Sequence, residues 1–464
     1  MQIQRILYDQ LNTQYCYHDV DQYLFLHSSK SLWSPYGSLH LNPHSQKIEY
    51  DASTNFISEL QQWPKSATRC SVSSYLVGLQ YYCKDHDVSK IVVMTPSEPS
   101  LLSHIISLQD KLSASHITLE LRPNIQFLVS HDEFVTQFEK PPVMETFYRW
   151  MRRKFDVLMD GDKPVWGKRN YDAENRSFDK SFTQTADQII YPVSRSQALS
   201  VLEQFVSYKL DRFGELEDAM YQHNDTVFHS LLSTSINFGL LTPWEVIKAV
   251  EHSDTALNNK EWFIRQILWW REYMYHRFWH YKDTIYQQNS LNHIKTLPKW
   301  FWWPEESPLK MNCINHVLKT VKNTWYSNHI TRLMIIGNFT LLMWYNPHDV
   351  NKWFWEMYAD AFEWVVTPNV LGMSQFADGG NLATKPYISS ANYINKMSDY
   401  CNTCYYDPKI KEWPKACPMN YLYWNFIDKH RDLFKRQPYI ASNLNKIDVE
   451  LIRKQAQEFI DGVI

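Results

Sequence analysis

The chain has 464 residues and a formal charge of −3 at pH 7, and 44% of its residues are hydrophobic. This length predicts about two to three domains, and the composition is that of a globular chain rather than a disordered one. Only 11 glycines occur, and neither GxGxxG nor GxxxxGK[ST] is present. A Rossmann dinucleotide fingerprint and a P-loop are therefore excluded, because both need glycine where the backbone approaches phosphate.

No targeting or membrane segment is evident in the sequence. Residues 1–5 lack the apolar core of a signal peptide, and the longest apolar run, 333–345, contains Gly337 and Asn338. That run is too short to span a bilayer, so we expect it to form a buried helix. These features predict a cytoplasmic protein with no membrane partner. The near-neutral charge does not point to nucleic acid, but a local basic groove remains compatible with it.

Residues 1–135 alternate between short apolar runs and helical patterns. The apolar runs predict strands at 3–7, 23–26, 91–94 and 125–128, and helices are expected at 56–62 and 100–113. Strands that alternate with helices indicate a parallel α/β sheet.

A basic segment begins the expected linker, residues 136–195. A helix over 144–158 would carry Arg149, Arg152, Arg153 and Lys154. These side chains are candidates for contacts with DNA phosphates; a solvated basic helix face is the alternative. Residues 160–164 break the helix, and 160–190 are polar and loop-rich.

Residues 196–464 show helical periodicity almost throughout. Capping residues ahead of apolar-periodic stretches predict helix starts near Ser194, Thr242 and Asp349. We therefore expect an α/β domain followed by an all-α domain.

Seven cysteines occur, and four of them lie in the helical part. Cys401 and Cys404 form a CxxC, Cys417 follows, and Cys313 lies upstream. Four thiolates can hold either structural zinc or an iron–sulfur cluster, although unrelated thiols are also compatible with this spacing. Cys16, Cys70 and Cys83 are better interpreted as ordinary buried thiols.

Several motifs of the helical part occur together. They are GMSQFADGG at 372–380, TKPY at 384–387, YINKMSDYC at 393–401, RFG at 212–214, EDAM at 217–220, HSLLS at 229–233 and FIRQIL at 263–268, with MDGD at 159–162 and DAENR at 172–176. This set resembles the iron–sulfur bacterial cryptochromes and photolyases, also called prokaryotic (6-4) photolyases. The resemblance covers about residues 144–430, and the first 130 residues match only loosely.

The resemblance implies a photolyase/cryptochrome fold, with an N-terminal Rossmann-like parallel-sheet domain and a C-terminal helical FAD domain. It implies a 4Fe-4S cluster, whose ligands would be Cys313, Cys401, Cys404 and Cys417. It also implies light-driven repair of pyrimidine–pyrimidone (6-4) photoproducts in UV-damaged DNA, by electron transfer from photo-excited reduced FAD. A monomer is expected.

The same resemblance assigns site residues. The HSLLS segment would hold the FAD phosphates, and serine hydroxyls and helix amides can do this without glycine. The cofactor-binding residues would be Ser230, Leu231, Leu232, Ser233, Gln266, Arg271, Arg332, Asp360 and Val366. The catalytic residues would be His329 as proton donor, with Tyr387 and Tyr393. Trp353 and Trp303 would relay electrons to the flavin.

The chain departs from the family pattern at several positions. Asn328 precedes His329 where two adjacent histidines are usual, Val366 replaces a glutamate often found opposite flavin N5, and Trp269 replaces a usual glycine. Residues 8–11 lack the first glycine of a Gly-Asp-Gln-Leu motif, and residues 27–30 lack an acidic motif. In relatives these two segments bind a 6,7-dimethyl-8-ribityllumazine antenna, so we expect that antenna to be absent.

Two other functions remain open. Asn328 and Val366 favour a blue-light photoreceptor cryptochrome that signals through flavin redox state without repair, whereas His329 with the two tyrosines favours a (6-4) DNA photolyase. A third reading is a DNA- or RNA-binding protein without photochemistry, because the helical iron–sulfur part also resembles part of the primase large subunit.

Overall fold

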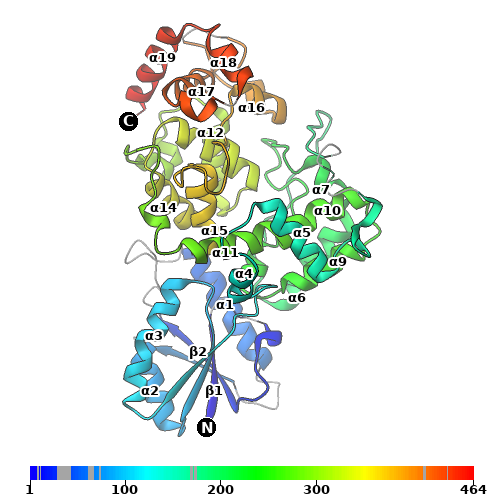
Figure 1. Ribbon diagram of the computed structural model, residues 1–464, viewed down its shortest axis with the longest axis vertical. Coiled ribbons are helices and arrows are strands. Elements are labelled where there is room, and N and C mark those ends of the chain that lie inside the picture. Colours follow the sequence, from blue (N-terminus) through cyan, green and yellow to red (C-terminus); the bar gives the residue numbers. More distant parts are fainter. Residues whose placement is uncertain are drawn as a thin grey trace.

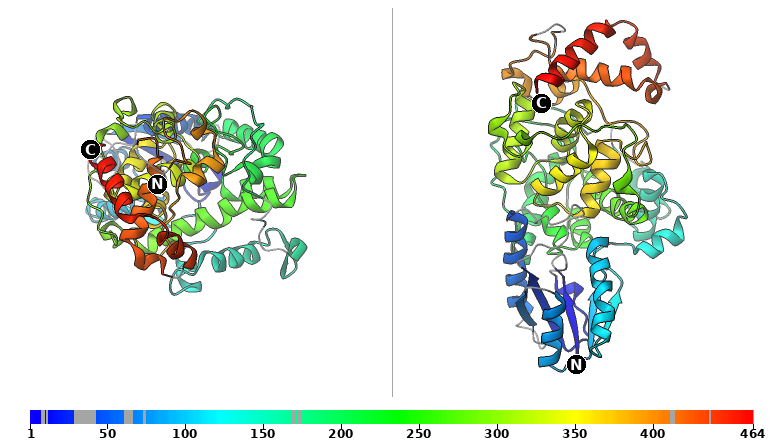
Figure 2. Two further views of the ribbon diagram at one scale, coloured as in Figure 1. Left: turned by 90° about the horizontal axis from the view of Figure 1, so that it is seen from above. Right: turned by 90° about the vertical axis from the view of Figure 1, so that its left-hand side faces the viewer.

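The computed structural model describes residues 1–7, 10, 12–28, 43–60, 67–72, 75–167, 171, 175–410, 414–435 and 437–463. The molecule is elongated, with a sheet at the N-terminal end and helices over the rest (Figures 1 and 2). The last helices, α17 (Pro418–Lys429), α18 (Pro438–Leu444) and α19 (Val449–Gly462), lie at the end opposite the sheet.

The N-terminal sheet has five strands in the order β3-β2-β1-β4-β5, and every neighbouring pair is parallel. The strands are β1 (Gln2–Ile6), β2 (Gln22–Ser28), β3 (Ala67–Val72), β4 (Lys90–Met94) and β5 (Thr118–Arg122). Helix α1 (Pro43–Leu60) lies on one face, and α2 (Tyr75–Asp85) and α3 (Pro99–Ser113) lie on the other (Figure 2). Because both faces are covered, four of the five residues of β1 and of β4 are buried. The α/β prediction is therefore confirmed.

Two strand predictions require correction. The run at 125–128 is not a strand; the fifth strand is β5, which ends at Arg122. Phe127 instead stacks on Tyr275 of the helical part, with ring centroids 3.5 Å apart, so the buried aromatic residue of this run packs against the helical part rather than in the sheet. The edge strand β3 was not predicted, because its sequence ATRCSV contains three polar residues.

The segment after the sheet contains short elements. They are α4 (His131–Gln137), α5 (Met144–Phe155), the hairpin β6 (Met159–Asp160) and β7 (Lys163–Pro164), and an irregular stretch up to Ser194. Helix α5 ends three residues earlier than expected, because Asp156 adopts a left-handed conformation with φ of 52°. The division into residues 1–135, 136–195 and 196–464 stays a prediction.

The helical part contains α-helices, π-helical turns and 3-10 turns. Its α-helices are α6 (Arg195–Gln204), α7 (Leu210–Leu216), α8 (Ser233–Asn237), α9 (Pro243–Glu251), α10 (Leu257–Arg265), α11 (Glu272–Tyr281), α12 (Asn312–Thr324), α13 (Asn338–Leu342), α14 (Pro347–Met357), α15 (Glu363–Thr367) and α16 (Ala391–Met397), followed by α17 to α19. The π-helical turns are η4 (Phe205–Lys209), η5 (Gln266–Arg271), η9 (Thr331–Gly337) and η10 (Pro368–Ser374). The 3-10 turns are η1 (Thr13–Tyr15) and η2 (Val165–Gly167) ahead of this part, and η6 (Ile285–Gln287), η7 (Lys299–Phe301), η8 (Pro304–Glu306), η11 (Tyr400–Thr403) and η12 (Arg431–Phe434) within it.

The helix starts follow cap chemistry. Ser194 caps α6, and Thr242 forms a reciprocal capping box with Glu245 at the start of α9, as expected. The start near Asp349 is wrong, because α14 begins at Pro347 and is capped by Asn346, whose side chain accepts from His348 N at 3.0 Å. Asp349 instead accepts a hydrogen bond from the backbone N–H of Leu297 at 3.2 Å.

The apolar run at 333–345 falls mainly in η9 and α13, which are largely buried. Within the described ranges, no helix has both the length and the apolar character that crossing a bilayer requires.

The sheet domain directly supports one wall of the helical part. The Glu98 carboxylate accepts a hydrogen bond from the backbone N–H of Glu363, the first residue of α15, at 2.6 Å. The Glu363 carboxylate accepts in turn from Ser100 Oγ at 2.9 Å and Tyr286 OH at 2.7 Å. An acidic group at a helix N-terminus is electrostatically favourable. These bonds fix the position of α15, which contributes to the cavity described next.

Candidate functional site

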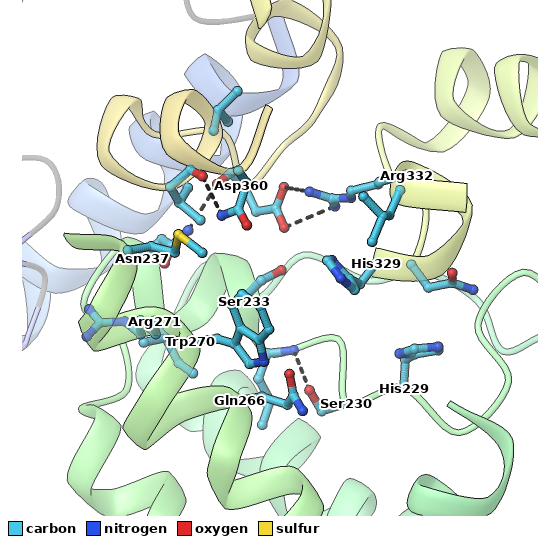
Figure 3. Close-up of a pocket in the computed structure, with 18 of the residues that line it drawn as sticks. His229, Ser230, Ser233, Asn237, Gln266, Trp270, Arg271, His329, Arg332 and Asp360 are labelled. Atoms are coloured by element: carbon cyan, nitrogen blue, oxygen red, sulfur yellow. Dashed lines mark hydrogen bonds and ion pairs between the residues drawn. The ribbon is translucent and has the colours of Figure 1, made fainter. Parts of the chain in front are cut away.

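A cavity of about 330 Å³ lies within the helical part, a size in the range of cofactor sites. Three π-helical turns, η5, η9 and η10, contribute residues to its wall, together with α8, α15 and the loop before α8 (Figure 3). Such turns are rare and occur often at functional sites. His329 lines this cavity. So do all the residues that the sequence analysis assigned to a cofactor, namely Ser230, Leu231, Leu232, Ser233, Gln266, Arg271, Arg332, Asp360 and Val366.

One side of the cavity is held by an ion pair. The Arg332 guanidinium donates from Nη1 and Nη2 to the two carboxylate oxygens of Asp360, each at 3.1 Å. Its Nε donates to the carbonyl of Ser327 at 2.9 Å, and Asn237 Nδ2 donates to the Asp360 carbonyl at 2.9 Å. The bidentate geometry fixes both side chains, so the cavity is preorganised on this side (Figure 3).

The segment from Ser230 to Ser233 has the backbone geometry of an anion site. Leu231 has a φ of 58°, in the left-handed region, and Leu232 is right-handed helical with φ of −92° and ψ of −5°. Successive residues of opposite hand turn their N–H groups toward a common concave side, which binds anions. Beyond this turn, the hydroxyls of Thr234 and Ser235 are buried and have no partner. The turn therefore offers donors to a phosphate without any glycine.

Arg271 contributes differently from the sequence expectation. Although it lines the cavity, its guanidinium is turned away from the centre (Figure 3) and donates to Glu272 Oε1 at 2.8 Å and to the Gln126 carbonyl at 3.4 Å. The guanidinium carbon also lies 4.1 Å from the centre of the Phe127 ring. Arg271 therefore links the helical part to the segment after the sheet, and its charge is already paired there.

His329 projects into the cavity just before η9, and its ring centre lies 6.4 Å from that of Trp270. Burial, followed by the nearby charges of Arg332 and Arg176, lowers the pKa of His329 to about 4. The imidazole is therefore neutral at pH 7 in this state. The preceding Asn328 is buried, and its Oδ1 accepts from the backbone N–H of Thr331 at 3.0 Å. Asn328 thus fixes the turn that presents His329.

Two further ionisable residues line the cavity and were not singled out from the sequence, although both lie in quoted motifs. Burial and the neighbouring Asp218 raise the pKa of Glu217 to about 8, and Trp262 Nε1 donates to its carboxylate. Burial, with Lys209 and then His329 among the nearby charges, lowers the pKa of His229 to about 3. His229 Nε2 lies 3.1 Å from the Glu217 carbonyl. Their pKa shifts depend on burial, which the motifs do not reveal.

The other assigned residues lie outside the cavity wall. Tyr387 is 40% exposed, and Tyr393 packs partly buried against the core of the helical part. Trp353 is fully buried, donates from Nε1 to the Phe301 carbonyl at 3.0 Å, and has its ring 5.0 Å from Phe354, which does line the cavity. Trp303 is 46% exposed. Among the described rings, no contact joins Trp303 to Trp353.

The four C-terminal cysteines share a second, small cavity. Cys313, Cys401, Cys404 and Cys417 line it together with apolar and aromatic side chains such as Met311 and Ile394. Burial raises the pKa of Cys401 to about 11 and that of Cys417 to about 12. Within the part of the chain that the structure describes, no three His, Cys, Asp or Glu side chains converge on a point suited to one metal ion.

The basic helix α5 differs from expectation in one residue. Arg152 is buried and donates to the carbonyls of Val157 at 3.2 Å and Leu158 at 2.5 Å, so it closes the end of α5 instead of facing solvent. Arg149 pairs with Glu145 at 2.7 Å and Lys154 with Glu133 at 2.5 Å. Arg153 is exposed.

Some predicted features lie outside the described residues. They are residues 8, 9 and 11 of the first antenna segment, residues 29 and 30 of the second, and residues 172–174 of the DAENR motif. The side chains of His27, Ser28 and Cys70 are likewise not described.

Comparison with known proteins places this geometry in a family. A family model described as deoxyribodipyrimidine photo-lyase-related protein matches residues 38–221. A (6-4) photolyase from Agrobacterium fabrum is 39% identical over 388 residues, which cover 76% of this chain and 75% of that protein. An uncharacterised protein, R855, of Acanthamoeba polyphaga mimivirus is 43% identical over 102 residues, covering 22% of this chain and 76% of that protein.

Solved structures show the same fold. A bacterial class III photolyase from Agrobacterium tumefaciens has a TM-score of 0.59 at 16% identity, covering 80% of this chain and 78% of its own. A cryptochrome from Synechocystis has a TM-score of 0.59 at 12% identity, covering 80% and 81%. The fold is that of photolyases and cryptochromes, and the sequence identity shows that the chain belongs to the photolyase-related family that includes the (6-4) photolyase.

Proposed function

We propose that this protein repairs pyrimidine–pyrimidone (6-4) photoproducts in UV-damaged DNA in a light-dependent reaction. The observation that carries this proposal is one preformed cavity in which a glycine-free anion site, a bidentate Arg332–Asp360 pair and His329 occur together. The Agrobacterium fabrum relative, which bears the name (6-4) photolyase, supports it. The protein would act as a monomer in the cytoplasm, where its thiols stay reduced.

The cavity residues fit FAD as the cofactor. The backbone donors around Leu231 and the cavity-lining hydroxyls of Ser230 and Ser233 suit a diphosphate, and Arg332 with Asp360 suits the polar edge of a flavin. Bound reduced FAD supplies the light-driven electron donor. Val366 and Phe354 present apolar wall that excludes water. Arg271 would not contact FAD; it would hold the cavity wall in place through its bonds to Glu272 and Gln126.

The four cysteines fit a 4Fe-4S cluster. Thiolates are soft ligands that suit iron–sulfur clusters or zinc, and the shared cavity of Cys313, Cys401, Cys404 and Cys417 has apolar walls. Thiolates bound to different irons of a cluster are spaced more widely than thiolates bound to one ion. We therefore favour a cluster over zinc, because within the described residues no three of these thiols meet at a point suited to one metal ion.

Repair needs a proton held near the lesion. A damaged base must leave the duplex to reach a buried site, and this costs least for damaged bases. His329 would deliver the proton, and phosphate charge arriving with DNA would raise its low pKa. Tyr387 and Tyr393 would contact the extruded lesion. Arg149, Arg153 and Lys154 would contact phosphates, whereas Arg152 is withdrawn from that role because it is buried.

The proposed function has a direct test. Reduced protein, blue light and an oligonucleotide with a single (6-4) lesion should restore two pyrimidines, and the same mixture in the dark should not. Bound FAD without light-dependent repair would instead support the photoreceptor reading, which Val366 and Asn328 favour. Protein without FAD would exclude both.

A further inference from the structure

A stack of aromatic rings leads from the cavity toward helix α5. Trp270 lines the cavity and stands near its centre in Figure 3. The ring of Trp269 stacks on Trp270 at a centroid distance of 5.4 Å and an interplanar angle of 29°. Trp269 also stacks on Tyr148 of α5, with a centroid distance of 5.4 Å and an interplanar angle of 21°. The three rings are therefore continuous, and all three can be oxidised by one electron.

The far end of the stack has a proton acceptor. The Tyr148 hydroxyl donates to Glu261 Oε1 at 2.8 Å, and Glu261 is itself paired with Arg265 at 2.8 Å. Oxidation of a phenol releases its proton, so a hydrogen-bonded carboxylate makes that oxidation easier. The Arg265 guanidinium carbon lies 5.5 Å from the Trp269 ring centre. It also lies 5.8 Å from the Tyr148 ring centre, so its positive charge disfavours a cation on either ring. Of the two, only Tyr148 can lose the positive charge by passing a proton to a hydrogen-bonded carboxylate.

The end of the stack also lies next to solvent. Tyr148 is buried, yet it borders a surface hollow of about 60 Å³ whose other residues include Arg149, Arg153 and Asp162. A small reductant in this hollow would reach van der Waals distance of the phenol ring. By contrast, Trp353 contacts the cavity-lining ring of Phe354, which is not readily oxidised, and the ring of Tyr358, which does not line the cavity.

We propose that Trp270, Trp269 and Tyr148 form an electron relay that supplies the cavity with electrons from solution. This proposal rests on the flavin of the proposed function as the light-excited acceptor. Trp270 gives up one electron to the excited oxidised flavin, Trp269 refills Trp270, and Tyr148 refills Trp269 while its phenolic proton passes to Glu261. A solvent thiolate then returns one electron to Tyr148 and becomes a thiyl radical, and Glu261 returns the proton to the phenol oxygen.

The relay is tested in the FAD-loaded protein under blue light with an added thiol. Trp269→Phe and Tyr148→Phe should each slow bleaching of the flavin absorption by about tenfold or more. Trp424→Phe on α17 and Tyr208→Phe on the exposed face of η4 are matched controls that should bleach at the native rate. Native bleaching rates in both relay variants, or loss of bleaching in Trp353→Phe alone, would overturn the relay.

A second measurement uses the native protein and does not depend on how the variants fold. Illumination without thiol, followed by freezing, should give the electron paramagnetic resonance signal of a tyrosyl radical, and its formation should be slower in deuterium oxide. A tryptophan radical alone would contradict the assignment of Tyr148. Absence of bound FAD would refute the proposed function, whereas bound FAD without a tyrosyl signal would refute only the relay.

Discussion

Arg332 and Asp360 form a two-point ion pair in the wall of the cavity, with both nitrogen–oxygen distances at 3.1 Å. Arg332 lies in the first turn of η9 and Asp360 precedes α15, so the pair joins two parts of the cavity wall that are 28 residues apart in sequence. The Arg332 guanidinium carbon also lies 4.0 Å from the centre of the Tyr358 ring. The pair therefore orders the cavity before any ligand enters.

Asp360→Asn should destabilise the protein by about 3 kcal/mol, because it leaves a largely buried guanidinium without its carboxylate. Urea unfolding of FAD-free protein measures this cost, and FAD titration should show weaker binding. Asp179→Asn is the matched control, since it removes a more exposed pair with Arg212 at 3.1 Å and should destabilise the protein much less, as surface ion pairs do. Equal losses in the two variants would contradict the structural role of Asp360.

His329 gives a prediction about pH. With a pKa of about 4, the protonated fraction of His329 rises as pH falls from 8 toward 5, by about tenfold per pH unit. Single-turnover repair should accelerate over the same range until His329 is fully protonated in the DNA complex. His329→Ala should lose about 10²–10⁴ in rate and the pH dependence together, with FAD still bound. His252→Ala, at the exposed end of α9, is the control; a pH slope that persists in His329→Ala would place the acid elsewhere.

The sequence predicted those strands whose apolar residues are buried in the sheet itself. Strands β1, β2 and β4 carry such buried residues, for example Ile3, Leu24 and Val92. The run 125–128 differs, because its Phe127 packs on the ring of Tyr275 and the guanidinium of Arg271. That contact joins segments about 145 residues apart, and local periodicity carries no information about it. Helix starts were predictable where a side chain caps the backbone, as at Thr242, and were misplaced by three residues where Asn346 competes with Asp349.

The cavity residues were assigned from motifs, and the structure places them around one cavity; their role in binding a cofactor stays a prediction. The charge state of these residues was not predictable in the same way. Arg152 and Arg271 look like free cations in the sequence, but packing turns one toward the end of its own helix and the other toward Glu272. Nothing in the motifs distinguishes Glu217 and His229 from other residues of their type. Burial raises the pKa of Glu217 and lowers that of His229, and both shifts favour the uncharged form.

The cysteine cavity gives a prediction about metal content. Purified protein should contain about four irons per chain with a broad visible absorption. Cys417→Ala should lose iron and most of its folded fraction, because cluster binding is coupled to folding. Cys83→Ala, a buried thiol of the sheet domain, should keep its iron. Zinc in place of iron would contradict the cluster, although the same four cysteines would still be the metal ligands.

The antenna prediction is tested by extraction. Because residues 8–11 and 27–30 lack the motifs of lumazine-binding relatives, heat-denatured protein should release FAD and no 6,7-dimethyl-8-ribityllumazine. Mass spectrometry of the supernatant measures both compounds in one sample. Lumazine in an amount close to that of FAD would show that other residues of the sheet domain bind it.

Glu217 predicts that FAD binding weakens in alkaline solution. Its pKa of about 8 arises mainly from burial and secondly from Asp218, so at pH 7 the carboxyl is mostly protonated and places no full negative charge in the cavity wall. As pH rises through 8, the group ionises beside a ligand that carries two phosphates. We expect FAD to bind about fivefold more weakly at pH 9 than at pH 7 for a coupling of about one pKa unit between FAD and Glu217.

Glu217→Gln mimics the protonated acid and should remove this pH dependence while binding FAD normally at pH 7. The free energy of unfolding should also fall as the pH rises. Because the folded pKa lies above the unfolded value of 4.5, the contribution of Glu217 is complete below pH 4.5 and is lost as pH rises through 8. Fluorescence titration with FAD at pH 7 and 9 compares native protein, Glu217→Gln and the exposed control Glu215→Gln, which pairs with Arg212. A native-like alkaline loss in Glu217→Gln would mean that another group, such as Asp218, is responsible.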